Sequence, residues 1–163
     1  MVALTFVVLL GACGAADKDR FRVAGGSMEP GIEAGTTVVA DPVTDGGYQG
    51  RRGDVVVFQR PNSWPAEGGD TLVKRVIAIG GETVACCDRL GRVTVDNVAL
   101  DEPYLGDNAP LHAPAGTCRG RQFGPVAVAA DHVFVLGDTR LLSVDSACHG
   151  PIPVSAVVGI VKQ

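Results

Sequence analysis

The amino-acid sequence predicts a mainly β fold in one domain, preceded by a hydrophobic N-terminal segment. The length of 163 residues fits one domain plus a short appendage. The 22 glycines and 10 prolines, with only 5% aromatic residues, suit many short strands joined by turns better than long helices. No segment after residue 20 has a convincing helical period, so we expect the folded part to consist of strands and loops.

The N-terminal segment, residues 1–16, is predicted to meet a membrane. Val2 to Ala16 contains only Thr5 as a clearly polar side chain, and the charged run at 17–20 ends it. As a helix, sixteen residues would reach about 24 Å, short of the roughly 30 Å core of a bilayer. Three interpretations stay open: an anchor with a truncated start, a cleaved export signal, or a lipoprotein segment in which Cys13 is lipidated. The fourth is a buried helix of a soluble protein.

The predicted strands follow in order, separated by loops rich in Gly, Asp and Pro. Residues 54–59 are nearly all apolar, as in a buried strand, and residues 71–79 carry the longest strand signal. The dipeptide Asp96-Asn97 between two short β-type runs is a hairpin signature. In chain order the predicted strands are residues 36–41, 54–59, 71–79, 92–95, 98–100, 132–136 and 156–161, and residues 106–124 are predicted to be irregular.

The charge distribution argues against a nucleic-acid partner. The net charge is -4, and the 14 basic residues are scattered, with no run longer than the pairs Arg51-Arg52 and Lys74-Arg75. Nucleic-acid binding needs a basic stripe or patch. We therefore expect no nucleic acid among the partners of this protein.

The cysteines fit an exported protein, and they are Cys13, Cys86, Cys87, Cys118 and Cys148. If Cys13 belongs to the N-terminal segment, the remaining cysteines allow three connectivities. A bond between the neighbours Cys86 and Cys87 needs a geometry that most backbones reject, so a disulfide from this pair to Cys118 or Cys148 is favoured. A zinc site of cysteines and His149 is the alternative, although the spacings match no common ligand pattern.

Lys74 is predicted to lie among apolar side chains. In a strand over residues 71–79, alternation places Leu72, Lys74, Val76 and Ala78 on one face. A lysine there either extends its amine to water, the simpler structural interpretation, or stays buried, which lowers the pKa of the amine. Because a free lysine has a pKa of about 10.4, only the buried alternative makes Lys74 a base at neutral pH.

Ser27 lies in a turn-rich stretch between Gly25-Gly26 and Met28-Glu29-Pro30. Glycines allow unusual dihedrals and close approach of the backbone to a ligand, and Pro30 stiffens the exit from the turn. Such a loop can present a hydroxyl and a backbone N–H to a carbonyl, but a serine needs an adjacent base to become a nucleophile. The sequence has no Gly-x-Ser-x-Gly elbow to support a triad with a histidine. Taken alone, Ser27 is an ordinary surface-turn residue.

Four sequence blocks occur in a fixed order. They are Ser27-Met28-x-Pro30, Arg52-Gly53-Asp54-Val55-Val56-Val57-Phe58, Val73-Lys74-Arg75-Val76-Ile77, and Gly137-Asp138-Thr139-Arg140 with Ser143, Asp145 and Ser146 behind it. Together they resemble the bacterial type I signal peptidases, or leader peptidases, over residues 21–161. The resemblance implies a fold of antiparallel sheets with an N-terminal hydrophobic helix. It makes residues 1–16 a membrane anchor or signal segment and residues 21–163 a Ser/Lys peptidase domain.

By this resemblance the protein would be a serine endopeptidase that cleaves signal peptides from exported preproteins at the membrane surface. Ser27 would be the nucleophile and Lys74 the general base, without a metal or another cofactor. Preprotein signal peptides and membrane lipid would be its partners. A single N-terminal anchor in the cell membrane would hold an extracytoplasmic catalytic domain.

The same resemblance assigns supporting roles to further residues. Ser143 would hydrogen-bond and orient Lys74, within a polar scaffold of Asp138, Arg140 and Asp145. Met28 and Pro30 would contribute to substrate binding, and Arg75 would be structural. The Ser27 backbone N–H would help to hold the oxyanion. Gly25 lacks the hydroxyl that some members of the family carry two residues before the nucleophile.

Several residues depart from the family pattern. Thr139 stands where Asn is usual, and Leu141-Leu142 replaces more polar residues. Ala147 replaces an arginine that normally partners Asp145, and a buried unpaired carboxylate is costly, so Arg140 is the candidate replacement. These departures favour an alternative: a catalytically impaired exported lipoprotein or binding domain on the same scaffold. A second rival is the self-cleaving repressors, which share Ser/Lys chemistry but need a DNA-binding domain ahead of residue 21.

Overall fold

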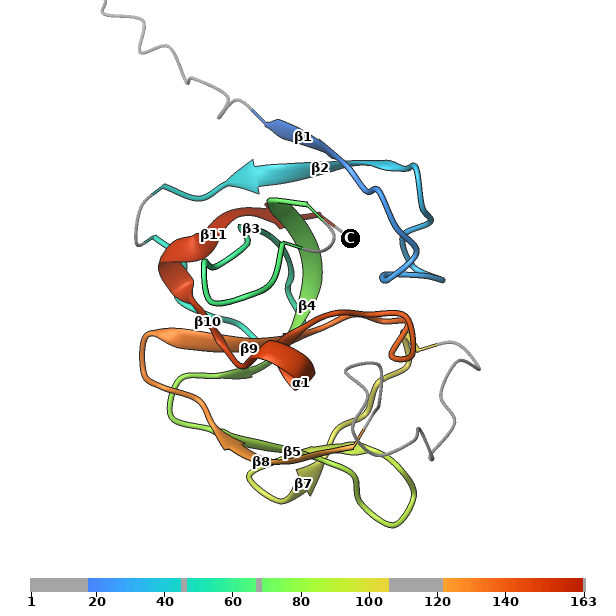
Figure 1. Ribbon diagram of the computed structural model, residues 1–163, viewed down its shortest axis with the longest axis vertical. Helices are drawn as coiled ribbons and strands as arrows, with labels where there is room; N and C mark the ends of the chain where they lie inside the picture. The colour runs from blue at the N-terminus through green and yellow to red at the C-terminus, as the bar shows by residue number, and fades with distance from the viewer. Residues whose placement is uncertain (1–17, 45–46, 67–68, 106–121, 163) are drawn as a thin grey trace, which may run out of the picture.

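Strands dominate the described part of the chain (Figure 1). This computed structural model describes residues 18–44, 47–66, 69–105 and 122–162. The elements in chain order are β1 (Asp19–Arg22), β2 (Thr37–Pro42), β3 (Val55–Gln59), β4 (Thr71–Ile79), β5 (Thr83–Cys86), β6 (Val93–Val95), β7 (Val98–Ala99), β8 (Phe123–Ala127), β9 (His132–Leu136), α1 (Ser146–His149), β10 (Ile152–Pro153), the 3-10 turn η1 (Val154–Ala156) and β11 (Val157–Val161). The predicted mainly β class is confirmed.

A larger, curled sheet carries most of the strands. Its order is β1-β2-β11-β3-β4-β9-β10, and each neighbouring pair is antiparallel. Figure 1 shows β2, β11, β3 and β4 curling around one another, while β9 closes the lower side of this sheet. Strand β4 is therefore an interior strand, hydrogen-bonded to β3 on one side and to β9 on the other.

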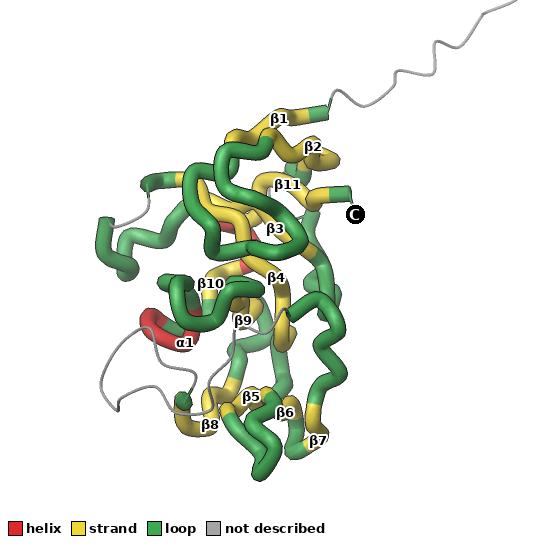
Figure 2. Tube along the Cα trace, turned by 90° about the vertical axis from the view of Figure 1, so that its right-hand side faces the viewer, coloured by secondary structure: helices red, strands yellow, loops and turns green. Residues whose placement is uncertain are grey.

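A smaller sheet, of order β7-β6-β5-β8, forms the opposite end of the molecule from β1 (Figure 2). The chain leaves the larger sheet after β4, builds the smaller sheet, and returns as β9, which pairs with β4. The smaller sheet is thus an insertion between two strands that are neighbours in the larger one. It brings residues near 102 within reach of the segment that follows β9.

Three clusters of buried apolar side chains hold the strands together. The first cluster centres on Phe58 and Trp64, the second on Ile77 and Phe134, and the third on Met28. The second cluster joins β4 and β9 to β5 and β6, which fastens the smaller sheet to the larger one. Full burial of each such side chain stabilises the fold by about 1.5–3 kcal/mol.

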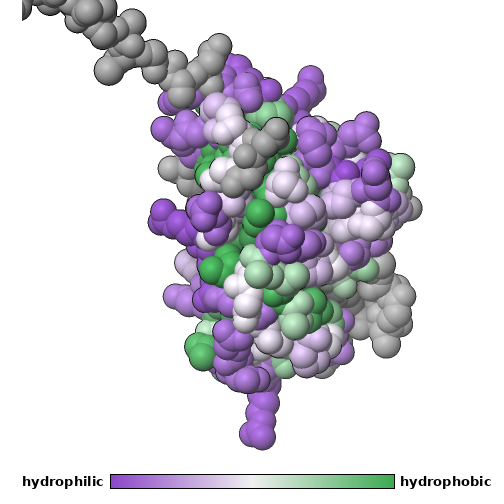
Figure 3. All heavy atoms as spheres, turned by 90° about the vertical axis from the view of Figure 1, so that its left-hand side faces the viewer, coloured by the Kyte–Doolittle hydropathy of each residue, from purple (hydrophilic) through white to green (hydrophobic). Residues whose placement is uncertain are grey.

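Apolar side chains also reach the surface. The face that lies to the left in Figure 1 has hydrophilic margins and apolar side chains gathered along its middle (Figure 3). Leu90, Val98 and Leu142 are the exposed large apolar residues of the described part. Scattered apolar exposure is normal for a folded protein, so only an exposed residue beside a pocket, as Leu142 is, calls for a specific explanation.

The alternation of side chains along β4 slips at a bulge. The register with β9 shifts between Val76 and Ala78. Val76 and Ile79 both pack with the first cluster, whereas Ile77 and Ala78 both belong to the second. The prediction that Ala78 shares the face of Val76 is therefore wrong, because an extra residue in a bulge turns the following side chains.

The other predicted strands agree with the structure to within about two residues, a margin typical of strand ends. The predicted hairpin is confirmed, since Asp96 and Asn97 have positive φ angles of 49° and 65° between β6 and β7. Strands β1, β5, β8 and β10 and helix α1 were not predicted, because each is short and several contain Gly, Pro or Cys. Residues 123–124, predicted to be irregular, begin β8, while residues 106–121 lie outside the described residues.

The disulfide prediction is wrong for the vicinal pair. Cys86 is bonded to Cys87, and the peptide between them is cis, with the two Cα atoms 3.0 Å apart. These two residues thus adopt the arrangement that the sequence argument had judged most backbones to reject. Cys13 and Cys118 lie outside the described residues.

The predicted N-terminal helix also lies outside the described residues, which begin at Lys18. Among the helices of the described ranges, none has the length and apolar character needed to cross a bilayer.

Candidate active site

Ser27 lies on the loop that connects β1 to β2. The Val23 N–H donates to Thr36 O and the Gly35 N–H donates to Val23 O, which closes the base of this loop. Within it, the Met28 side chain is fully buried in the third cluster and anchors the turn. The neighbouring Ser27 side chain is consequently held at the surface of the curled sheet.

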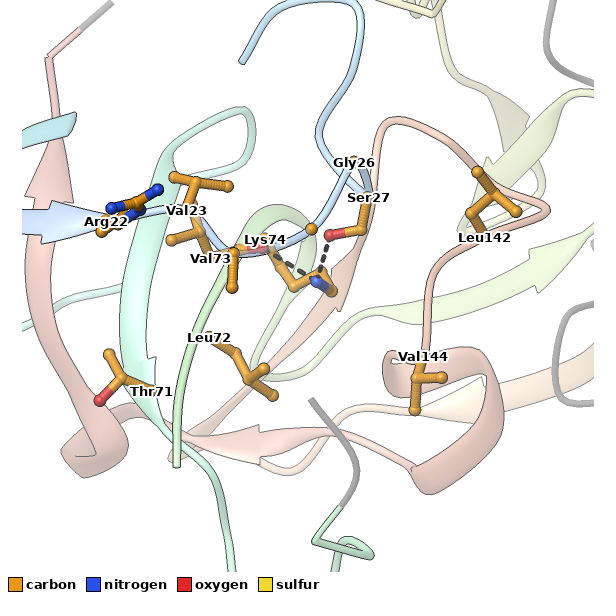
Figure 4. Close-up of a pocket in the computed structure, with 12 residues that line it drawn as sticks. Arg22, Val23, Gly26, Ser27, Thr71, Leu72, Val73, Lys74, Leu142 and Val144 are labelled. Atoms are coloured by element: carbon orange, nitrogen blue, oxygen red, sulfur yellow. Dashed lines mark hydrogen bonds between the residues drawn. The ribbon is translucent and has the colours of Figure 1, made fainter. Parts of the chain in front are cut away.

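Lys74 lies in the interior strand β4, opposite Val56 of β3. Its Nζ donates to Ser27 Oγ at 2.7 Å and to Val73 O at 3.0 Å (Figure 4). Only 4% of Lys74 is exposed. Burial lowers the pKa of this amine, while the charges of Asp145 and Asp138 oppose that effect. The arrangement holds a lysine with a weakened proton affinity against a serine hydroxyl.

A pocket of about 410 Å³ opens beside these two side chains. Figure 4 shows Ser27 and Lys74 between Arg22 and Val23 on one side and Leu142 and Val144 on the other. The lining residues come from the end of β1 and the following loop, from β4 and from the segment after β9: Arg22, Val23, Ala24, Gly25, Gly26, Ser27, Thr71, Leu72, Val73, Lys74, Leu142 and Val144. Met28 and Pro30, expected at the substrate site, are not among them, because Met28 points into the core and Pro30 is exposed elsewhere on the loop.

The segment 137–145, which we call the support turn, packs against the Ser27 loop. The Thr139 N–H donates to Ser27 O at 3.0 Å. The Thr139 hydroxyl lies 2.9 Å from Gly26 O and 2.8 Å from Glu29 O, so it can donate to either carbonyl. Thr139, at the position where the family usually has Asn, thus fastens three consecutive parts of the loop that carries Ser27.

Gly137 is needed at the start of the support turn because there is no room for a side chain. A Cβ at this position would come within 2.3 Å of Ser143 Oγ and 2.5 Å of Ser27 O. The close contact between the support turn and the Ser27 loop therefore depends on the absence of a side chain.

The buried Ser143 hydroxyl has no hydrogen-bond partner among the described residues. The expected hydrogen bond from Ser143 to Lys74 is absent there, since the lysine amine bonds Ser27 and Val73 instead. Ser143 packs against Gly137, which explains why its side chain supports the turn rather than the lysine.

Asp145 is satisfied by backbone amides. It accepts hydrogen bonds from the Gly137 N–H and the Ala147 N–H, both at 3.0 Å, and it caps the N-terminus of α1. Burial raises the pKa of its carboxyl, against the opposing effect of the nearby Ser143 hydroxyl, of these amides and of the Lys74 charge. The amides give Asp145 hydrogen-bond partners in place of the arginine that Ala147 removes, although the effect of burial on its pKa still outweighs them.

Arg140 and Arg75 form buried ion pairs. The Arg75 guanidinium donates to both oxygens of Asp138, at 2.9 Å and 2.7 Å, which supports the structural role expected for Arg75. Arg140 donates to Glu102 at 2.5 Å and 3.3 Å, so its ion-pair partner is Glu102 rather than the predicted Asp145. The reason is topological: the chain beyond β7 brings Glu102 to the support turn.

Sequence reasoning missed Glu102, Tyr104 and the pocket residues Arg22 and Leu72. The Tyr104 hydroxyl donates to Glu102 at 2.7 Å, and the Arg75 guanidinium stacks on the Tyr104 ring at 3.9 Å from its centroid. The one available signal was the requirement that a buried Arg140 has a carboxylate partner. Several acidic residues could have been that partner of Arg140, and the sequence alone does not identify which one it is.

Within the described residues, no group of three or more His, Cys, Asp or Glu side chains is placed to hold a metal ion. Cys118, one of the cysteines that the zinc alternative could use, lies outside the described ranges.

Comparison with known proteins shows what this chain is similar to. The family model described as signal peptidase, peptidase S26, matches residues 1–163. A signal peptidase I of Mycobacterium tuberculosis is 34% identical over 177 residues, which cover 82% of this chain and 60% of the relative. A probable signal peptidase I-1 of Synechocystis sp. is 32% identical over 168 residues, which cover 98% of this chain and 75% of the relative.

A solved structure shares the fold. The crystal structure of a signal peptidase I from Enterococcus faecalis is 27% identical, with a TM-score of 0.53, and the match covers 71% of this chain and 98% of that chain. The chain spans about 60% of the length of the mycobacterial relatives that it matches.

Proposed function

This chain belongs to the signal peptidase family S26, and from this premise we propose that it is a serine endopeptidase that cleaves signal peptides from exported preproteins. Ser27 is the nucleophile and Lys74 the general base. The observation that carries the proposal is the 2.7 Å contact between Lys74 Nζ and Ser27 Oγ, made by a buried lysine beside an open pocket. A general base must lie within hydrogen-bond reach of the proton it removes and must have a pKa near the working pH.

The reaction follows from this contact. The neutral Lys74 amine takes the proton of the Ser27 hydroxyl while Oγ attacks the scissile carbonyl carbon. The tetrahedral intermediate collapses, the peptide C–N bond breaks, and the Lys74 ammonium gives its proton to the leaving amine. Lys74 then takes a proton from water as the water oxygen attacks the acyl carbon. When the ester bond to Ser27 breaks, Lys74 returns that proton to Oγ, which releases the new carboxyl end and restores the Ser27 hydroxyl and the neutral amine.

The oxyanion of the intermediate is held by the Ser27 backbone N–H. Gly25 has open space where a Cβ would point, with no heavy atom within 4 Å, so the loop offers no side-chain donor at that position. A second oxyanion donor, worth about 10²–10³ in kcat, would therefore have to come from another part of the chain.

Residues 1–16 hold the peptidase domain, residues 21–163, at an extracytoplasmic membrane surface, where signal peptides are presented. From Ala16 to Ser27 the chain can reach at most about 37 Å fully extended, which keeps the nucleophile close to the bilayer. Membrane lipid and preproteins are the partners in this proposal, and no cofactor takes part.

The test is cleavage of a model preprotein by the full chain and by two variants. We expect Ser27→Ala and Lys74→Ala each to lower the rate by at least about 10⁴-fold, because the nucleophile and base act as one unit. Both variants should unfold cooperatively in denaturant. The matched controls are Ser63→Ala and Lys162→Ala, in exposed residues away from the pocket.

Undiminished cleavage by either dyad variant would refute the assigned roles. Absence of cleavage by the unaltered chain, with retained binding of the preprotein, would favour the binding-domain alternative.

A further inference from the structure

Glu102 is a buried acidic residue outside the pocket. Its side chain is 5% exposed and pairs with Arg140, whose side chain is 4% exposed. The Tyr104 hydroxyl donates to the same carboxylate. Glu102 lies in the segment that follows β7 of the smaller sheet, whereas Arg140 lies in the support turn that follows β9. The contact therefore joins the smaller sheet to the turn that packs against the Ser27 loop.

Arg140 also binds the backbone of the support turn. Its Nε donates to Gly137 O at 3.0 Å while its other nitrogens donate to Glu102. Two residues along the turn, Thr139 holds Ser27 O through its N–H. Glu102 is thus connected to Ser27 through one side chain and one short stretch of backbone.

Tyr104 provides a second connection between the same two segments. Its ring lies under the Arg75 guanidinium, and Arg75 grips Asp138 in the support turn through two hydrogen bonds. Residues 102–104 therefore meet the support turn twice, through Glu102 with Arg140 and through Tyr104 with Arg75. Attachment at two points restrains rotation of the turn as well as its position.

A buried ion pair contributes little net stability compared with well-packed apolar side chains, because desolvation offsets the attraction. What such a pair supplies is directionality, since the planar guanidinium fixes both position and angle against a carboxylate. An ion pair at this location is therefore suited to hold a geometry.

We propose that Glu102, supported by Tyr104, is a positioning residue for the nucleophile: through Arg140 it holds the support turn, and through Thr139 the turn holds Ser27 against Lys74. The inference rests on the proposed peptidase function. Glu102 is not among the residues that line the pocket, so its removal should impair the chemical step rather than substrate binding.

The test compares Glu102→Gln with Glu82→Gln in the full chain. Both substitutions remove the charge of a glutamate that is paired with an arginine, but Glu82 pairs with Arg52 at the turn between β4 and β5. We expect Glu102→Gln to lower kcat at least about tenfold with KM unchanged, because small displacements of a nucleophile cost rate steeply. Glu82→Gln should leave both constants at their original values.

Hydrogen exchange at the Thr139 amide gives a readout that does not need activity. This amide donates to Ser27 O, so its exchange reports directly on the link between the support turn and the Ser27 loop. We expect exchange to be faster by about tenfold or more in Glu102→Gln and unchanged in Glu82→Gln. If Glu102→Gln does not fold, Tyr104→Phe carries the same measurement, because it removes only the hydroxyl that donates to Glu102.

Original values of kcat and of Thr139 exchange in Glu102→Gln would overturn the inference, even if Ser27→Ala proves the peptidase function. Conversely, if the unaltered chain cleaves no preprotein, the proposed function fails, while Thr139 exchange still decides whether Glu102 holds the turn. A fall in kcat matched by an equal rise in KM would also overturn the inference, because it would indicate a role in binding.

Discussion

Lys74 lies where its charged form is disfavoured. An interior strand buries the amine, and the charges of Asp145 and Asp138 oppose this effect on its pKa. Arg75 neutralises Asp138, and backbone amides satisfy Asp145, so neither carboxylate is committed to Lys74. Because each carboxylate has other hydrogen-bond partners, the Lys74 amine stays available as a base.

The pH dependence of cleavage follows from the lowered pKa of Lys74. A base must be neutral, so activity should rise with pH through the folded-state pKa, which lies below the ordinary value of 10.5, and fall as the amine is protonated. We expect kcat/KM to show one acidic limb. His132→Gln should leave that limb in place, since a histidine base is not involved.

The measurement is a profile of initial cleavage rates across pH on a model preprotein. A limb that disappears in His132→Gln, or one centred near the ordinary lysine pKa, would contradict the assignment of Lys74 as a neutral base.

At the scale of elements, the support turn packs against the loop that carries Ser27, and we propose that it positions Ser27 against Lys74. It begins at Gly137, where no side chain fits, continues through Thr139, which holds the Ser27 loop, and ends at Asp145, which caps α1. The turn is itself held by residues 102–104 from the smaller sheet. Residues 102–104 contact the support turn, and the support turn contacts the loop that carries Ser27, so the three segments are connected in series.

Gly137→Ala should show how tightly this turn is packed. The added Cβ would collide with Ser143 Oγ and Ser27 O, so we expect a loss of unfolding free energy of about 1–3 kcal/mol and a strong loss of cleavage. Gly124→Ala is the control, because a Cβ there meets nothing within 4 Å. Denaturant unfolding and initial rates on both variants are the measurements.

Equal stability of the two glycine variants would show that the Ser27 loop can move away from Gly137 at no cost. In that case the support turn could not fix the position of Ser27.

At the scale of the whole molecule, the proposed function assigns membrane contact and chemistry to different parts of the chain. Strand β1, the first element of the described chain, lies at the outer edge of the larger sheet, and Ser27 follows it directly (Figure 1). In the proposed function, residues 1–16 supply the membrane contact and the two sheets supply the site.

Deletion of residues 1–16 should separate these two roles. We expect the shortened chain to cleave a soluble peptide containing a cleavage site within about twofold of the full-chain rate, because the deletion removes no contact described for the site. It should no longer sediment with lipid vesicles. Equal vesicle binding by both chains would place the membrane contact elsewhere on the molecule.

Much of the site could be predicted from sequence because it depends on residue type and order. The four blocks contain Ser27 and Lys74, and strand alternation suggested a lysine among apolar neighbours. The sequence did not predict hydrogen bonds between residues that lie far apart along the chain. Arg140 meets Glu102 across 38 positions, and Thr139 meets Glu29 across 110 positions, which no local pattern reports.

The prediction of the disulfide partner of Cys86 and Cys87 was also wrong. The sequence argument held that a bond between Cys86 and Cys87 needs a geometry that most backbones reject, whereas the structure bonds these two residues. Likewise Ser143 matched the family pattern, yet its hydroxyl packs against Gly137 and does not reach Lys74.

The amino-acid sequence by itself determined the β class, which follows from local composition and periodicity, and the order of the four motif blocks. The resemblance of those blocks to the type I signal peptidases, and not composition or periodicity, implies the two side chains of the proposed dyad. The tertiary structure alone decided that Lys74 is buried within 2.7 Å of Ser27, which residues line the pocket, and that Glu102 pairs with Arg140 of the support turn. Burial and distance depend on how sheets pack, and packing is a property of surfaces brought together from remote parts of the chain.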